Sequence, residues 1–344
     1  MKKLVVAISA LIAVSCGGTS EQPSASNTSE TSPSSNWTIT DIQETGIEGV
    51  SPELIQDSNG EFLLLATNTS NKRAHKSQDG INFSQIDMNV PIGSDYSLIQ
   101  KSDGTWLLYF VGMNMQNVNP NNQNQPNMPA QPGNPPQPPQ PGQPNQPEGM
   151  QPVEPAAQMN SQVGGKIVYV STSKDLITFT DPVETGIFQP GQTRAWGVPD
   201  TYFTPEGKIQ MMWVDQIEGE RFEVLKTADS NDGITFTENE GYIIKDGYVD
   251  PYMLQVEKDN WILILSTTPD PSRLPQRLYM ATSTDGKDWN IDKEPILFDE
   301  KINYLDPAAV KIGENQWRLI ITTVEKDKAM TGPYKYLSSV LTKN

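Results

Sequence analysis

The chain has 344 residues, with 42 acidic and 25 basic side chains and a formal net charge of −17. Nucleic acids and anionic lipid surfaces are bound by basic faces, so this charge argues against both as partners and favours a neutral or cationic ligand. The single cysteine excludes an internal disulfide, and the single histidine excludes a metal site built on several histidines and cysteines.

Residues 1–15 have the features of a bacterial signal peptide. Lys2 and Lys3 precede an apolar run from Leu4 to Val14, which is too short to span a bilayer. The run ends in Ala-Val-Ser before Cys16, and this pattern resembles the lipobox of bacterial lipoproteins. The resemblance implies a lipid on Cys16 as the only membrane contact and, because Gly17 follows, delivery to the outer membrane of a Gram-negative bacterium. The alternative is an ordinary secretory signal with an incidental cysteine.

Residues 16–36 are dominated by Ser, Thr, Asn and Pro. Such a segment has too little apolar surface to offset the entropy lost on ordering. We therefore expect a flexible tether between the lipidated Cys16 and a folded domain.

Five similar units occupy residues 37–344. Each begins with a short apolar strand, turns at polar residues and returns as a stronger apolar strand. These first halves begin at Ser51, Asp95, Pro199, Asp250 and Asp306. Four of the units continue with a strand, a turn containing aspartate, and an aromatic residue, at Phe83, Phe179, Phe236 and Trp289. Four strands at a period of roughly 50 residues predict an all-β, five-bladed β-propeller with four-stranded antiparallel blades.

The fifth unit lacks an outer strand, and the chain has a matching segment at its other end. Trp37 to Ile47 resembles Phe179 to Ile187, which is an outer strand of the second unit. We therefore expect the N-terminal strand to complete the last blade and close the ring, which removes exposed sheet edges. An open sandwich of short strands is the alternative.

Residues 115–164 consist mainly of Pro, Gln, Asn and Gly. This composition cannot pack a core and predicts a disordered or polyproline-like insertion. Its place in the repeat puts it between the second and third strands of the second blade.

Candidate functional residues gather where the inner strands begin, at the end of the propeller that we call the upper face. Asp95, Asp200, Asp250 and Asp306 lie at or next to these strand starts. Aromatic and basic residues are expected to surround them: Arg194, Trp196, Tyr248, Tyr252, Arg277 and Tyr304. A funnel of carboxylates and aromatic faces suits a sugar. The alternatives are Asp-Pro pairs that only cap turns, or a Ca²⁺ ion in the funnel; no other cofactor is predicted.

A second set of aspartates lies in the turns between third and fourth strands, on the opposite, lower face. Its members are Asp79, Asp175, Asp232 and Asp285. The turn Ser-Thr-Asp-Gly-Lys-Asp-Trp, which ends at Trp289, resembles the Asp-box of sialidases, where the motif staples a turn. We therefore interpret these four residues, called the turn aspartates below, as structural.

The Asp-Pro inner strands and the Ser-Lys-Asp-Leu-x-x-Phe turn resemble glycoside hydrolase family 43 and its relatives in family 32. Members of that clan use an Asp base at the first inner strand, an Asp that tunes pKa at the third and a Glu acid at the fourth. Here Ser51 occupies the first position, Asp200 lies beside the third and Asp250 occupies the fourth. The family's base is therefore absent, its acid is absent or replaced by Asp250, and Asp200 is the only match to the tuning residue. The candidate catalytic residues are Asp250, Asp200 and Asp306, with Asp250 and either Asp306 or Asp95 as a rearranged pair. Such a pair must flank the glycosidic bond, roughly 5–10 Å apart.

These observations predict a monomeric, envelope-anchored, glycoside hydrolase-like propeller. It would bind, and with such a pair hydrolyse, an extracellular carbohydrate at the Asp-lined funnel. The alternative is a non-catalytic envelope lipoprotein that binds a protein partner through the upper face and the Pro-rich insertion.

Overall fold

The computed structural model describes residues 36–57, 59–67, 73–113, 165–189, 196–329 and 331–344. Residues 1–35 of the predicted signal peptide and tether, the insertion at 115–164 and Arg194 lie outside this part of the chain. No helix within the described residues is long and apolar enough to cross a membrane.

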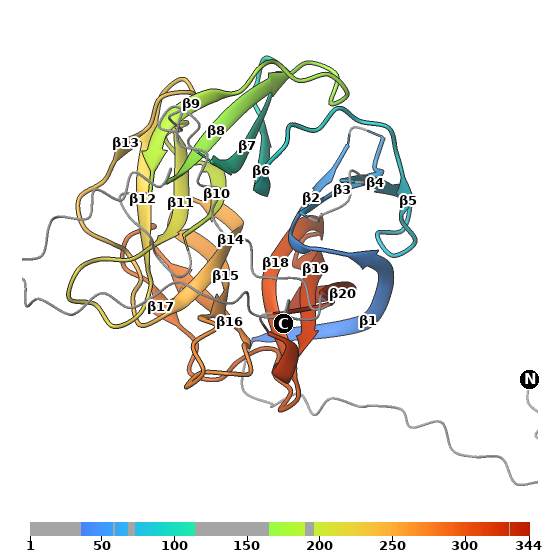
Figure 1. The fold of residues 1–344 in the computed structure, drawn as a ribbon, viewed down its shortest axis with the longest axis vertical. Helices are drawn as coiled ribbons and strands as arrows, with labels where there is room; N and C mark the ends of the chain where they lie inside the picture. The colour runs from blue at the N-terminus through green and yellow to red at the C-terminus, as the bar shows by residue number, and fades with distance from the viewer. Residues whose placement is uncertain (1–35, 58, 68–72, 114–164, 190–195, 330) are drawn as a thin grey trace, which may run out of the picture. The chain divides into compact units, whose positions relative to one another are not determined.

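Five four-stranded antiparallel sheets form a ring, with one strand of each sheet at the centre (Figure 1). In the first two blades the strands, from inner to outer, are β2 (Val50–Gln56), β3 (Phe62–Thr67), β4 (Ala74–Ser77) and β5 (Ser84–Gln85), then β6 (Ser94–Gln100), β7 (Trp106–Met113), β8 (Lys166–Ser173) and β9 (Val183–Phe188). In the third and fourth blades they are β10 (Gly197–Phe203), β11 (Ile209–Asp215), β12 (Val224–Ser230) and β13 (Thr237–Glu238), then β14 (Tyr248–Glu257), β15 (Asn260–Thr267), β16 (Leu278–Ser283) and β17 (Asn290–Ile291). The predicted five-bladed propeller is confirmed.

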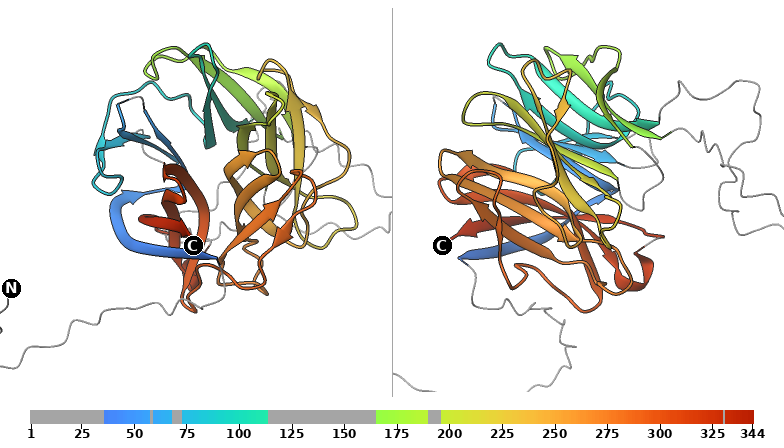
Figure 2. Two further views of the ribbon diagram at one scale, coloured as in Figure 1. Left: turned by 180° about the vertical axis from the view of Figure 1, so that it is seen from behind. Right: turned by 90° about the vertical axis from the view of Figure 1, so that its left-hand side faces the viewer.

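The fifth blade combines the two ends of the folded domain. Its strands, from inner to outer, are β18 (Ile302–Gly313), β19 (Gln316–Glu325), β20 (Lys335–Lys343) and β1 (Trp37–Glu48), with a 3-10 helix, η2 (Lys326–Lys328), between β19 and β20. β1 pairs antiparallel with β20 from Trp37 opposite Lys343 to Glu48 opposite Lys335 (Figure 2). The predicted closure of the ring by the N-terminal strand is confirmed, and the open sandwich is excluded.

The hydrophobic core lies between neighbouring blades. Successive side chains of a strand point to opposite faces of its sheet, so a blade packed on both sides buries consecutive apolar residues. In β3, Leu64 packs in a cluster with Ile320 of the fifth blade, and Leu65 packs in a cluster with Leu108 of the second. Both leucines are fully buried. This packing explains why the middle strands read as continuous apolar runs.

Each inner strand contains a β-bulge near its start, where the pairing with the second strand shifts register. The residue at each bulge has a positive φ between 43° and 54°, and these residues are Ser51, Asp95, Val198, Asp250 and Asp306. Aspartate tolerates this left-handed conformation better than most residues, whereas a β-branched residue such as Val198 is strained in it. A bulge changes the direction of the side chains near it, and the five inner strands each have one around the axis of the propeller.

Candidate functional site

Two layers of side chains surround the axis of the propeller at its upper face. The outer layer contains the five bulge residues, and the deeper layer contains the residues two positions further along each inner strand. The deeper layer consists of Glu53, Ser97, Asp200, Tyr252 and Ala308. Asp200 therefore lies one layer deeper than Asp95, Asp250 and Asp306.

Glu53 is the residue at this site that the sequence interpretation missed. Pro52, Pro199 and Pro251 each follow a bulge residue, and aligning them pairs Glu53 with Asp200. This alignment of the prolines, called the proline register below, is the feature of the sequence that indicates Glu53. Glu53, Asp200, Asp250 and Asp306, called the axial acids below, are each at most 8% exposed.

The axial acids line a cavity of only about 20 Å³, together with Ser51, Asp95, the tyrosines Tyr96 and Tyr252, and the residues after the bulges. That volume holds about one water molecule, whereas pockets for small molecules usually enclose ~300–1,000 Å³. A sugar ring does not fit inside this cavity. It can touch only the mouth, by which we mean the opening of the cavity at the outer layer, where Asp95 lies. Among the described residues, no group of three or more His, Cys, Asp and Glu side chains is arranged to hold a metal ion.

Side chains of the inner strands join every pair of neighbouring blades. At each junction, a side-chain oxygen of one blade accepts the backbone N–H of an inner-strand residue in the next. In ring order, Glu53 accepts from Leu98 at 3.0 Å, Ser97 from Thr201 at 3.0 Å, Asp200 from Met253 at 2.6 Å, Asp250 from Asp306 at 3.4 Å, and Asp306 from Ser51 at 2.9 Å. All five junctions therefore depend on a polar side chain at the axis, and four of these side chains are the axial acids.

Asp250 and Asp306 also lie close enough for each carboxyl group to influence the pKa of the other. Burial raises the pKa of Asp250 to about 6, and the Ser266 hydroxyl donates a further hydrogen bond to its carboxyl group. Burial and the neighbouring charge of Asp250 raise the pKa of Asp306 well above its usual range. Asp306 therefore holds a proton more tightly than an exposed aspartate does.

The deeper acids also bind protons more tightly than usual. Burial raises the pKa of Asp200 to about 8. Burial and the nearby charge of Asp200 raise the pKa of Glu53 well above its usual range, and Tyr252 is hydrogen-bonded to the Glu53 carboxyl group. With a pKa of about 8, Asp200 is mainly a neutral hydrogen-bonding group near neutral pH.

The geometry of Asp250 and Asp306 does not suit a hydrolytic pair. Two carboxyl groups that cleave a glycosidic bond flank it from roughly 5–10 Å apart, and the inverting mechanism also needs room for water. Asp250 and Asp306 are both buried beside a cavity of about 20 Å³, which leaves no space for that bond. Asp95 differs from both, since it is only half-buried, accepts a hydrogen bond from Ser94 at 3.0 Å and opens towards the mouth.

Two aromatic residues predicted at the mouth lie in the core instead. Trp196 is 2% exposed and packs in the cluster that contains Trp213. Tyr304 is 8% exposed and packs in the cluster between the fourth and fifth blades. Trp196 directly precedes β10 and Tyr304 is the third residue of β18, and each ring is buried by packing against other blades. Neither ring is therefore available to stack on a ligand.

The remaining predicted rim residues are more accessible. Tyr248 is half-buried and packs edge-on against Tyr279, with ring centroids 5.5 Å apart. Arg277 is half-buried and lies over the Phe298 ring at 4.4 Å. Tyr252 is in the deeper layer, where its hydroxyl donates to the Leu54 carbonyl at 3.3 Å. Tyr248 and Arg277 thus stay candidates for ligand contacts.

The turn aspartates form the staples that the sequence predicts. In each turn the carboxylate accepts two backbone N–H groups, two and three residues further on, and the hydroxyl of the serine two residues before it. These contacts occur at Asp79, Asp175, Asp232 and Asp285. The backbone hydrogen bonds lower the pKa of all four carboxyl groups.

The sequence matches no family model and no curated protein. Solved structures do share the fold. A thermostable family-43 glycoside hydrolase has a TM-score of 0.58 at 10% identity, covering 90% of this chain and 92% of its own. An endo-1,4-beta-xylanase from Bacteroides thetaiotaomicron has a TM-score of 0.53 at 11% identity, covering 87% and 92%. An exo-1,5-alpha-L-arabinanase from a bovine ruminal metagenomic library has a TM-score of 0.52 at 10% identity, covering 87% and 94%. The chain therefore has the five-bladed propeller fold of family 43 glycoside hydrolases and related furanosidase-like enzymes.

Proposed function

We propose that this chain is a glycan-binding propeller that is held at the outer membrane by a lipid on Cys16 and does not hydrolyse its ligand. The observation that carries the proposal is that Asp250 and Asp306 each accept a backbone N–H from the next blade, beside a cavity of only about 20 Å³. It assigns these acids to the junctions between blades and leaves the mouth above them for binding.

The chemistry of the mouth supports a sugar as the ligand. Asp95 offers a half-buried carboxyl group that can accept hydrogen bonds from sugar hydroxyls. Tyr252 is half-buried, and its ring lines the same cavity as Asp95. A carboxyl group beside an aromatic ring is a usual combination for binding a pyranose or furanose. The net charge of −17 favours an uncharged glycan.

The absence of hydrolysis follows from the roles of the acids. Asp250 and Asp306 each accept a backbone N–H from the next blade, and the cavity between them has room for about one water molecule. Any movement that separated the two carboxyl groups for catalysis would break a junction. Binding at the mouth needs no such movement.

The test is a screen with two readouts on one set of samples. Arabinan, xylan and fructan are incubated with the protein, and both binding and release of reducing sugar are measured. We expect binding without release. Asp95→Asn should weaken binding about tenfold or more, because it removes the charge from one hydrogen bond at the mouth. Asparagine also adopts the left-handed backbone conformation of Asp95, so the fold is preserved.

The matched control is Asp181→Asn, which removes one exposed carboxylate just before β9 and should leave binding unchanged. Sugar release that Asp250→Asn abolishes would show that the chain is a hydrolase. Failure to bind any of the three polysaccharides would contradict the proposal.

A further inference from the structure

A second cleft lies on the lower face, at the opposite end of the inner strands from the axial mouth. It encloses about 750 Å³ between the first and second blades, within the usual range of ligand pockets. Its lining includes Gln56 at the end of β2 and Gln100 at the end of β6, together with Trp106 and Leu176. Unlike the axial cavity, it is large enough for an oligosaccharide segment.

Trp106 departs from the pattern of its repeat. It pairs with Gln100 as Phe62 pairs with Gln56 in the first blade, so the two residues are equivalent. The equivalent residues in the first, third, fourth and fifth blades are all at most 6% exposed, and they are Phe62, Ile209, Trp261 and Trp317. Trp106 is half-buried and lines the cleft. The second blade thus exposes an aromatic ring at a position where every other blade buries its side chain.

Leu176 is a second departure in the same cleft. The turn aspartates Asp79, Asp232 and Asp285 are each followed by glycine with a positive φ, whereas Asp175 is followed by Leu176 with a φ of 60°. Leucine is strained in this left-handed conformation. Its side chain packs against the cluster that includes Trp106 and lines the cleft beside it. Local strain often marks a binding site, and here it coincides with the exposed tryptophan.

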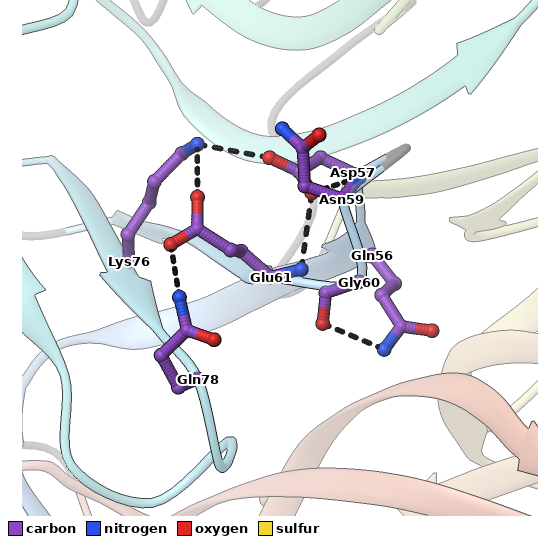
Figure 3. Close-up of polar contacts among 7 residues, drawn as sticks. All are labelled: Gln56, Asp57, Asn59, Gly60, Glu61, Lys76 and Gln78. Carbon is purple, nitrogen blue, oxygen red and sulfur yellow. Dashed lines mark hydrogen bonds and ion pairs between the residues drawn. The ribbon is translucent and has the colours of Figure 1, made fainter.

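The polar groups of the cleft are held in place by one another. Lys76 donates to Asp57 at 2.9 Å and to Glu61 at 3.1 Å, so its charge is already balanced (Figure 3). Asp57 also accepts the backbone N–H groups of Asn59 and Glu61. The remaining lysine of the lining, Lys174, donates to the Thr105 hydroxyl at 2.5 Å. The three acids of the lining, Asp57, Asp87 and Asp175, outnumber its two lysines, so the cleft does not favour an anionic ligand.

We propose that this cleft binds a segment of a neutral oligosaccharide, with the face of Trp106 stacked on a sugar ring. The amides of Gln56, Asn59 and Gln100 and the carboxyl group of Asp87 line the same space and can bond to hydroxyl groups. An aromatic face beside amides and balanced charges is the usual lining of a site for an uncharged sugar. This site is separate from the axial mouth and does not rest on it.

The experiment follows the indole N–H resonances of the full chain while short oligosaccharides of arabinan, xylan and fructan are added. We expect the Trp106 resonance to shift with at least one of them. Trp106→Ala should weaken that binding about tenfold, whereas Trp106→Phe, which keeps an aromatic face, should retain most of it. The matched control is Trp289→Ala, which removes a half-buried tryptophan beside the Asp285 turn of the fourth blade and should leave the binding unchanged.

Asp95→Asn separates the two sites. If an oligosaccharide binds, and Asp95→Asn weakens that binding while Trp106→Ala and Trp106→Phe do not, the cleft proposal is wrong and the axial proposal stands. If the Trp106 resonance shifts and Asp95→Asn has no effect on that shift, the cleft proposal is supported independently of the mouth. No shift of the Trp106 resonance with any of the three would overturn the cleft proposal.

Discussion

The aspartates at the two ends of the blades have pKa values that are shifted in opposite directions. At the upper face, burial raises the pKa of Asp200 and Asp250. At the lower face, each turn aspartate is exposed and accepts backbone N–H groups, which lower its pKa, as at Asp232. Both sets accept backbone hydrogen bonds, so the difference comes from burial. Removal from water disfavours the charged form by more than one or two N–H donors restore.

The raised pKa values of the aspartates at the upper face have a structural explanation. Buried carboxyl groups with raised pKa values in a central funnel are a usual sign of an acid–base catalyst, but structural networks produce the same shifts. Here Asp200, Asp250 and Asp306 each accept an N–H group across a blade junction. Burial at the axis raises their pKa values, so these values do not by themselves indicate a catalytic role.

The largest effect is expected from breaking a junction. Asp200→Ala would leave the Met253 N–H without its acceptor at a buried position, which should lower the free energy of unfolding by about 2–3 kcal/mol. Asp200→Asn keeps a carbonyl oxygen and resembles the protonated acid, so it should cost less than about 1 kcal/mol. Urea unfolding of both variants measures the difference. Equal losses in the two would mean that the junction needs a charged carboxylate.

A smaller effect is expected at the other end of the blades. Asp232→Ala removes acceptors for the N–H groups of Ile234 and Thr235, but these groups are exposed enough for water to replace the lost bonds. The free energy of unfolding should therefore fall by about 1 kcal/mol or less. The same urea experiment compares it with Asp200→Ala. A loss at Asp232 as large as the loss at Asp200 would remove the distinction between the two sets.

The fold could be predicted from the sequence because each blade repeats a local pattern. The ring closure was also readable, since Trp37 to Ile47 resembles an outer strand and the last unit lacks one. Asp250 and Asp306 were correctly placed at the axis for the same reason. These features depend on residues close together in the sequence or on the similarity of repeated segments.

The finer features of the site depend on contacts between blades, which the repeat does not encode. Asp200 and Glu53 lie in the deeper layer because each is two positions after a bulge residue, and only the proline register indicates this. The burial of Trp196 and Tyr304 is caused by packing against other blades. The small volume of the axial cavity likewise depends on how five inner strands converge. The cleft beside Trp106 was missed because its equivalent residues in other blades are buried.

The central claim is that the axial acids hold protons in the folded protein, and the pH dependence of stability tests it most directly. For Asp200 the folded pKa of about 8 lies above its usual value of 3.8, so between these values the folded state binds more protons than the unfolded state. The free energy of unfolding should therefore fall as the pH rises from about 5 to about 9. The turn aspartates act in the opposite direction only at acidic pH, since their lowered pKa values make stability fall as the pH drops below about 4.

The decisive measurement is the slope of unfolding free energy against pH for the protein, Asp200→Asn and Asp181→Asn. General charge repulsion also grows with pH in an acidic protein, and the exposed Asp181 variant corrects for the loss of one charge. We predict a clearly shallower fall in Asp200→Asn and an unchanged slope in Asp181→Asn. Equal slopes in all three proteins, or stability that rises with pH across this range, would contradict the claim that the axial acids are protonated. The axial acids would then again be candidates for catalytic carboxylates.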